Sequence, residues 1–181
     1  DAGHGSGFLI DSDKGLIATN YHVISGSINI LVKINETIKI KGIVVATSKY
    51  DDMAIVQINP NRTVDILSCN LAPQNYELFV GEDIYAIGSP LNQTELFSKG
   101  IISKVLERAI LSADLNINHG NSGGPLFNND EYVIGINTFG DNSQDNTGKI
   151  SGIIKINAIY PLIEEAINFI ANNDSIPDNQ K

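Results

Sequence analysis

Short runs of β-type residues recur along the whole chain, and they constrain its fold more than any other feature. Each run is rich in Ile and Val, and Gly, Asn, Asp and Pro separate one run from the next. Short strands at such regular spacing are typical of a β-sandwich or a β-barrel. The predicted strands are 7–11, 15–20, 29–34, 37–47, 53–58, 83–88, 97–105, 110–113, 132–139 and 149–156. The sequence therefore predicts an all-β protein.

One segment near the C-terminus has helical periodicity instead. Its apolar residues follow a period of 3.6, at Leu162, Ile163, Ala166, Ile167 and Ile170. Pro161 suits the first turn of a helix, and Glu164 and Glu165 suit the positive end of its dipole. The pattern predicts a helix over 161–173, followed by a polar tail over 174–181.

Composition excludes several classes of function. The chain has 21 acidic and 12 basic residues, for a net charge of −9, and no basic cluster that could neutralise a phosphate backbone. We therefore expect no nucleic acid as a partner, and an anionic membrane surface would repel the chain. The single cysteine, Cys69, excludes an internal disulfide and a Cys-cluster zinc site, and we expect it to be a buried structural residue. No apolar run approaches the ~18–20 residues of a membrane span.

A glycine-rich turn at 120–125, with the sequence Gly-Asn-Ser-Gly-Gly-Pro, carries the candidate nucleophile. Glycines let the backbone bend tightly, so that amides can converge on one point beside Ser122. A serine hydroxyl needs a neighbouring base, and the oxyanion formed by its attack needs hydrogen-bond donors. The expected donors are the backbone N–H groups of Gly120 and Ser122.

The candidate base is one of three histidines. His4 lies among glycines near one end, and His119 is three residues before Ser122, where a local neighbour rarely faces a nucleophile correctly. His22 follows a β-type run of small residues, 16–19, that could line a catalytic cleft. We assign the base to His22.

The candidate acid is one of two adjacent aspartates, which point in different directions in an extended chain. Asp52 directly precedes the apolar strand 53–56 and is assigned the orienting role, whereas Asp51 is expected to be a solvated turn residue. Asp65, Asp83 and Asp114 remain alternatives with loop or strand-edge interpretations. The resulting chain order, His-Asp-Ser, is that of the double β-barrel solution to the catalytic triad.

Many separate segments of the chain resemble motifs of the HtrA/Deg family of trypsin-like serine proteases, and they occur in the same order as in that family. The matching segments lie at 5–8, 18–23, 52–56, 81–83, 86–90, 99–103, 118–126 and 133–138. The resemblance implies two antiparallel β-barrels with the catalytic residues between them, over about 1–70 and 71–160, joined through 59–82. It implies a serine endopeptidase that acts through an acyl-enzyme on unfolded or extended polypeptides, in protein quality control, without a metal or organic cofactor.

The resemblance also implies a substrate site. Substrate is expected along Thr138, Phe139 and Gly140 as an added strand. The pocket for the residue before the cut, P1, would have walls from 116–119, 137–139 and 152–154, including His119 and Asn137. No aspartate falls at the family position for the floor of a pocket that binds basic side chains, so an apolar P1 residue is expected.

The sequence departs from the family pattern in several places. His119 stands where the family usually has Pro, Asn121 replaces the acid of activatable zymogens, and the regulatory loop between 101 and 114 is short. We expect no PDZ domain within the given residues after the helix, and we expect trimerisation to rely on a segment mostly upstream of residue 1. By resemblance, the expected location is extracytoplasmic: periplasmic, secreted or membrane-anchored.

Two other functions remain open on the same fold. One is a holdase or binding module that grips unfolded chains without cleaving them. The other is a processing protease with one narrow substrate. Substrate binding without turnover would distinguish the first, and pocket shape and loop mobility decide the second.

Overall fold

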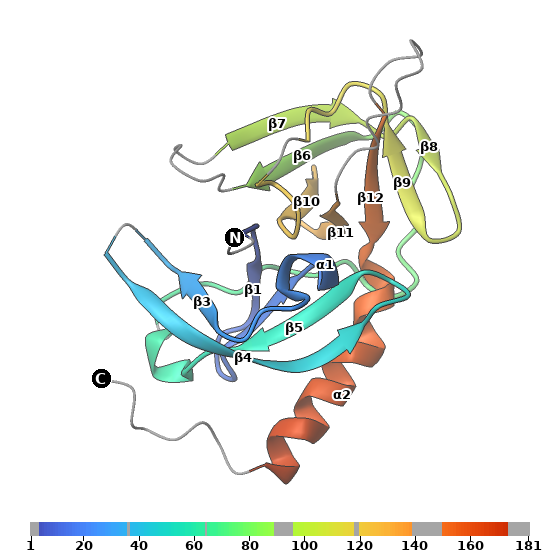
Figure 1. Ribbon diagram of the computed structural model, residues 1–181. Coiled ribbons are helices and arrows are strands. Elements are labelled where there is room, and N and C mark those ends of the chain that lie inside the picture. The colour runs from blue at the N-terminus through green and yellow to red at the C-terminus, as the bar shows by residue number, and fades with distance from the viewer. Residues whose placement is uncertain are drawn as a thin grey trace.

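The fold consists of two curled antiparallel sheets and a C-terminal helix (Figure 1). The computed structural model describes residues 4–35, 37–63, 65–88, 96–117, 120–138 and 150–173. The all-β prediction with one long helix is confirmed. The strands have branched, apolar residues on their inner faces, and the sheets bury these residues in a shared core.

The first sheet has five strands in the order β1-β2-β5-β4-β3. They are β1 (Phe8–Asp11), β2 (Leu16–Thr19), β3 (Ile30–Lys33), β4 (Lys39–Ser48) and β5 (Met53–Gln57). Strands β2 and β5 are buried along their whole length, and they occupy central positions in the sheet. A one-turn helix, α1 (Tyr21–Ile24), follows β2 and contacts β5.

The second sheet has seven strands in the order β7-β6-β10-β11-β12-β9-β8. They are β6 (Asp83–Gly88), β7 (Leu96–Ile101), β8 (Lys104–Val105), β9 (Ala109–Ser112), β10 (Pro125–Asn128), β11 (Val133–Asn137) and β12 (Ser151–Lys155). Strands β7 and β8 lie at opposite edges, yet only Ile102 and Ser103 separate them in the chain. Such a short connection requires the sheet to curl on itself, which gives the barrel shape.

The observed strands differ from the sequence expectations in two places. The predicted strand 97–105 is divided into β7 and β8 at the fully buried Ile102, because the curl of the sheet brings its two edge strands together there. Strand β10 was not predicted, since it is short and begins with Pro125 directly after the glycine-rich turn. Proline is compatible with a strand at its first residue.

The C-terminal helix α2 (Ile159–Asn172) begins two residues before the predicted start, after the 3₁₀ turn η2 (Ile156–Ala158). The first turn therefore contains no acidic residue, and Glu164 and Glu165 lie further along the helix than expected. Leu162 and Ala166 are buried and Ile163 and Ile170 pack against the core, but Ile167 is exposed. Helix α2 leaves the second sheet through β12 and packs against β4 and β5 of the first (Figure 1).

A single hydrophobic cluster spans both sheets and α2. It contains Phe8, Met53 and Ile55 from the first sheet, Ile84, Leu126 and Ile136 from the second, and Leu162 and Ala166 from the helix. Cys69 is half-buried against this cluster, and burial raises the pKa of its thiol. The thiol therefore remains protonated near neutral pH, in agreement with its expected structural role.

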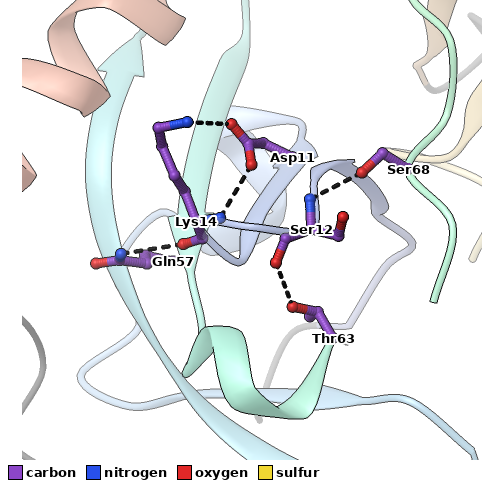
Figure 2. Close-up of polar contacts among 6 residues, drawn as sticks. All are labelled: Asp11, Ser12, Lys14, Gln57, Thr63 and Ser68. Atoms are coloured by element: carbon purple, nitrogen blue, oxygen red, sulfur yellow. Dashed lines mark hydrogen bonds and ion pairs between the residues drawn. The ribbon is translucent and has the colours of Figure 1, made fainter. Parts of the chain in front are cut away.

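The segment between the sheets is fixed to the first sheet by polar contacts (Figure 2). It begins with the 3₁₀ turn η1 (Pro60–Arg62). Thr63, which is fully buried, donates its hydroxyl to the Ser12 carbonyl at 2.6 Å, and the Ser12 N–H donates to the Ser68 hydroxyl at 2.8 Å. Asp11 and Lys14 flank Ser12 in the turn between β1 and β2. Burial alone would raise the pKa of Asp11, but hydrogen bonds and the charge of Lys14 lower this pKa on balance.

Asp51 is not the solvated turn residue that the sequence predicts. Its side chain is only 16% exposed, and its carboxylate pairs with the guanidinium of Arg108, in the β8–β9 hairpin of the second sheet. Its other oxygen accepts a hydrogen bond from Ser48 at 2.8 Å, and Arg108 also lies over the Tyr50 ring, 4.1 Å from its centroid. A charged side chain from a distant hairpin therefore holds the turn that precedes Asp52.

We predict that Arg108→Met lowers the free energy of unfolding by on the order of 1 kcal/mol, because Asp51 loses the partner of a largely covered carboxylate. Lys99→Met is the matched control. It removes the Lys99–Asp83 ion pair, whose side chains are 53% and 37% exposed, and should cost less. Urea unfolding followed by circular dichroism measures both, and equal losses would contradict the structural role of Arg108.

Candidate active site

His22 and Asp52 form a two-point contact at the place in the first sheet where β2 ends and β5 begins. The Asp52 carboxylate accepts the His22 backbone N–H through Oδ1 at 2.8 Å, and its Oδ2 lies 2.7 Å from His22 Nδ1. The His22 side chain is 46% exposed and that of Asp52 is 29% exposed. The contact therefore orients an imidazole that remains accessible to a bound molecule.

The helix α1 and the turn between β4 and β5 position the side chains of His22 and Asp52. His22 lies on α1, directly after β2, and Asp52 ends the turn between β4 and β5. Asp52 has a φ of 49°, a left-handed conformation that aspartate tolerates better than most residues but that still costs energy. The fully buried Asn20 supports the turn, because its side-chain amide donates to the Asp52 carbonyl at 2.9 Å.

The candidate nucleophile Ser122 lies in a tight turn that two glycines make possible. Gly120 has a φ of 101° and Gly123 a φ of 88°, both in the region that favours glycine. The Gly123 N–H donates to the Asn137 carbonyl at 2.8 Å, and the Gly124 N–H donates to the Asn121 carbonyl at 3.0 Å. The first bond attaches the turn to the end of β11, and the second lies within the turn itself.

The turn is packed directly against the first sheet. A Cβ on Gly123 would lie 2.1 Å from the Ser6 carbonyl oxygen and 2.4 Å from the Thr19 hydroxyl, so only glycine fits there. A Cβ on Gly5 would meet Val23 at 2.7 Å and the Ser122 carbonyl at 3.0 Å. Gly5 thus lies between the residue after His22 and the backbone of Ser122.

Thr138, which directly follows β11 of the second sheet, provides another contact between the two sheets, at the Asp52 carboxylate. The Thr138 hydroxyl lies 3.5 Å from Asp52 Oδ2, and the preceding residue, Asn137, accepts the Gly123 N–H. The structure therefore brings the predicted residues His22, Asp52 and Ser122 into one region at the junction of the two sheets.

The backbone amides of the turn are divided into two groups. Those of Gly123 and Gly124 donate to carbonyl groups, as described above. Among the described residues, no backbone carbonyl accepts the N–H of Gly120 or of Ser122. These two amides are the ones that the sequence singles out as donors to a developing negative charge.

Three segments that the sequence assigns to the P1 pocket lie next to one another. Asn137 of β11 pairs with Ile153 of β12, and the Thr138 N–H donates to the Gly152 carbonyl at 3.4 Å. The Ser151 hydroxyl donates to the Leu115 carbonyl at 2.7 Å, which places the irregular segment before Asn116 beside the start of β12. His119, Phe139 and Gly140, which the sequence also assigned to this site, lie outside the described residues.

Sequence reasoning missed several residues that support the site. Ser6 and Thr19 lie in recognisable motifs, but no motif reveals that they contact the turn of Ser122. The alternative aspartates have other partners: Asp83 pairs with Lys99, and Asp114 accepts the Ile101 N–H and the Ser112 hydroxyl. Those hydrogen bonds lower the pKa of Asp114.

Asn121 is almost completely buried beside the nucleophile, with 1% of its surface exposed. The Asn121 Oδ1 atom has no hydrogen-bond partner among the described residues. This atom packs against Gly88, where an added Cβ would lie only 2.1 Å from it. A carboxylate in this position would be a buried charge, whose removal from water costs on the order of several kcal/mol. A neutral amide therefore suits the position better than an acid.

Two features are absent from the described part of the chain. Within it, no three His, Cys, Asp or Glu side chains lie close enough together to hold a metal ion. None of its helices is long and apolar enough to cross a membrane.

Known proteins match both the sequence and the structure. Residues 5–136 match the trypsin-like peptidase domain family. The probable periplasmic serine endoprotease DegP-like of Halomonas elongata is 39% identical over 141 residues, or 74% of this chain and 29% of that protein. The serine protease Do-like HtrA of Bacillus subtilis is 28% identical over 184 residues, or 93% of this chain and 40% of that protein.

A solved structure agrees with these relatives. The crystal structure of the serine endoprotease from Yersinia pestis matches with a TM-score of 0.77 at 28% identity, over 91% of this chain and 57% of that one. The chain thus spans less than half of either relative and just over half of the solved chain. From the family match and the double-barrel architecture, we conclude that the chain belongs to the family of trypsin-like peptidase domains, with HtrA and DegP serine proteases among its relatives.

Proposed function

We propose that the protein is a serine endopeptidase that cleaves exposed polypeptide segments through an acyl-enzyme. The contact between His22 Nδ1 and Asp52 Oδ2, 2.7 Å long and next to the turn of Ser122, is the observation that carries this proposal. A binding protein has no physical need for an oriented histidine beside a serine turn. Membership of the trypsin-like peptidase family supports the same reaction.

In the proposed reaction, Ser122 Oγ attacks the scissile carbonyl while His22 removes the hydroxyl proton. His22 then returns this proton to the leaving amine, and a water molecule activated in the same way hydrolyses the acyl-enzyme. Asp52 stabilises the imidazolium that forms in each step. The charge on the attacked oxygen is stabilised by the backbone N–H groups of Gly120 and Ser122, for which no backbone acceptor lies among the described residues.

The two oxygens of Asp52 have distinct tasks in this mechanism. Oδ1 accepts the His22 backbone N–H and fixes the carboxylate relative to α1. In this mechanism Oδ2 accepts the proton on Nδ1, which leaves Nε2 as the nitrogen that accepts the proton of Ser122. The carboxylate thereby selects the tautomer that can act as a base.

The substrate is an extended polypeptide that pairs with the segment Thr138, Phe139 and Gly140 as an added strand. The P1 side chain would lie between the segments around Asn116, Asn137 and Gly152, and we propose that it is apolar. Action on unfolded proteins, and hence a role in quality control, is part of the proposal, and the similarity to HtrA proteases supports it. A processing protease with one narrow substrate and a holdase are the alternatives on this site.

The location proposed for the protein is extracytoplasmic, since the Halomonas relative is named as periplasmic. The proposed assembly is a homotrimer, on the condition that a segment upstream of residue 1 contributes to the contacts between copies of the chain. No metal or organic cofactor is required by the proposed mechanism, because its proton transfers and charge stabilisation use side chains and backbone amides alone.

We predict that Ser122→Ala lowers the rate of casein cleavage by a factor on the order of 10⁴ or more, since only the nucleophile is removed. Mass spectrometry of the new termini gives the P1 preference of the wild-type protein. Thermal unfolding checks that the variant is folded. An unchanged cleavage rate in the folded variant would rule out the assignment, whereas casein binding without cleavage by the wild type would favour the holdase.

The two adjacent aspartates provide a second test. Asp52→Asn should lower kcat by about 10⁴, because an amide no longer selects the reactive tautomer of His22. Asp51→Asn is the matched control, which weakens the contact with Arg108 but leaves the His22 contact intact, and it should retain activity within a few-fold. Steady-state kinetics on a peptide taken from the casein cleavage sites measures both. A larger loss in the Asp51 variant would assign the orienting acid to Asp51.

A further inference from the structure

We propose that Ser6 is a positioning residue that holds the turn of Ser122 in its reactive shape. Ser6 lies just before β1, more than a hundred residues from the turn, and it contacts the turn through two groups. Its hydroxyl donates to the Gly120 carbonyl at 2.5 Å, and its backbone N–H donates to the Ser122 carbonyl at 2.8 Å. This inference rests on the proposed endopeptidase function.

The backbone conformation of the Ser122 turn needs contacts from outside the turn, because the glycines within it restrict that conformation little. Gly120 has a φ of 101°, and a glycine backbone can rotate toward several other conformations at low cost. The peptide unit that contains the Gly120 carbonyl connects the two proposed donors to the oxyanion, so a rotation of this unit would change how the N–H groups of Gly120 and Ser122 point relative to one another. A donor fixed to the Gly120 carbonyl opposes that rotation, and fixed donors are what stabilise a transition-state charge.

Ser6 is itself anchored to the strand that leads to His22. Its carbonyl accepts the hydroxyl of Thr19, the last residue of β2, at 2.7 Å. The same carbonyl lies 2.1 Å from the position of a Cβ on Gly123. Ser6 therefore contacts both sides of the site: the turn that carries the nucleophile and the strand that precedes the base.

The hydroxyl is the part of Ser6 that can be tested alone. Ser6→Ala removes the bond to Gly120 and leaves both backbone contacts available. Ser6→Thr retains the γ-oxygen and its proton. Thr63→Val is the matched control, since it removes another hydroxyl that donates to a backbone carbonyl, at 2.6 Å, in the turn shown in Figure 2.

The experiment measures kcat and KM for a peptide derived from the casein cleavage sites, together with binding of a peptide boronic acid that carries the same P1 residue. Boron accepts an electron pair from Ser122 Oγ while His22 takes the hydroxyl proton, which gives a tetrahedral adduct that uses the same amide donors as the oxyanion. Thermal unfolding is measured for every variant.

We expect Ser6→Ala to lower kcat about tenfold, the factor that corresponds to one ordinary hydrogen bond, with KM unchanged. Boronate binding should weaken by a similar factor. Ser6→Thr should keep kcat within about threefold of the wild type. Thr63→Val should reduce only thermal stability.

Three results would overturn the inference: an unchanged kcat in folded Ser6→Ala, a rise in KM without a fall in kcat, or an equal loss of kcat in Ser6→Ala and Ser6→Thr. If Ser6→Ala does not fold, the Thr variant decides, because a tenfold loss of kcat there contradicts the role of the hydroxyl. A wild-type protein that neither cleaves casein nor binds the boronate would instead refute the endopeptidase function, and the inference with it.

Discussion

The close approach of the serine turn to the first sheet is the constraint on which the rest of the site depends. At Gly123 the backbone lies against the Ser6 carbonyl and the Thr19 hydroxyl, with no room for a side chain. The turn belongs to the second sheet, through β10 and the bond from Gly123 to Asn137, so this contact joins the two halves of the molecule. His22 lies only three residues after Thr19 in the chain. The contact between Thr19 and the serine turn therefore sets where the proposed base lies relative to the proposed nucleophile.

Other contacts between the sheets reinforce this arrangement at different points. Thr138 reaches Asp52 from the end of β11, and Arg108 reaches Asp51 from the β8–β9 hairpin. Helix α2 packs on β4 and β5 after leaving β12, and one hydrophobic cluster runs through both sheets. The turn that holds the strained Asp52 is thus supported from the second sheet on one side and by Asn20 on the other. Strain at such a residue persists only where its surroundings hold it in place.

Much of the fold could be predicted from local patterns. Runs rich in Ile and Val, with turn-forming residues between them, located most of the strands, and the 3.6 period located α2. Strand β10 was missed because its four residues, which begin with Pro125, carry no pattern of their own. The division at Ile102 was missed for another reason: whether a strand continues or crosses to the opposite edge depends on the curvature of the whole sheet. The early start of α2 depends on η2, whose single turn has no distinctive sequence signal.

The sequence by itself determined the all-β class, the long helix and the identities of His22, Asp52 and Ser122 as candidates, because motifs and chain order are local properties of the chain. Only the tertiary structure decided which aspartate contacts the histidine, that Asp51 pairs with Arg108, and that Ser6 and Thr19 contact the serine turn. These contacts join residues that are far apart in the chain. Their distances follow from how two curled sheets pack together, and no short stretch of sequence contains that information.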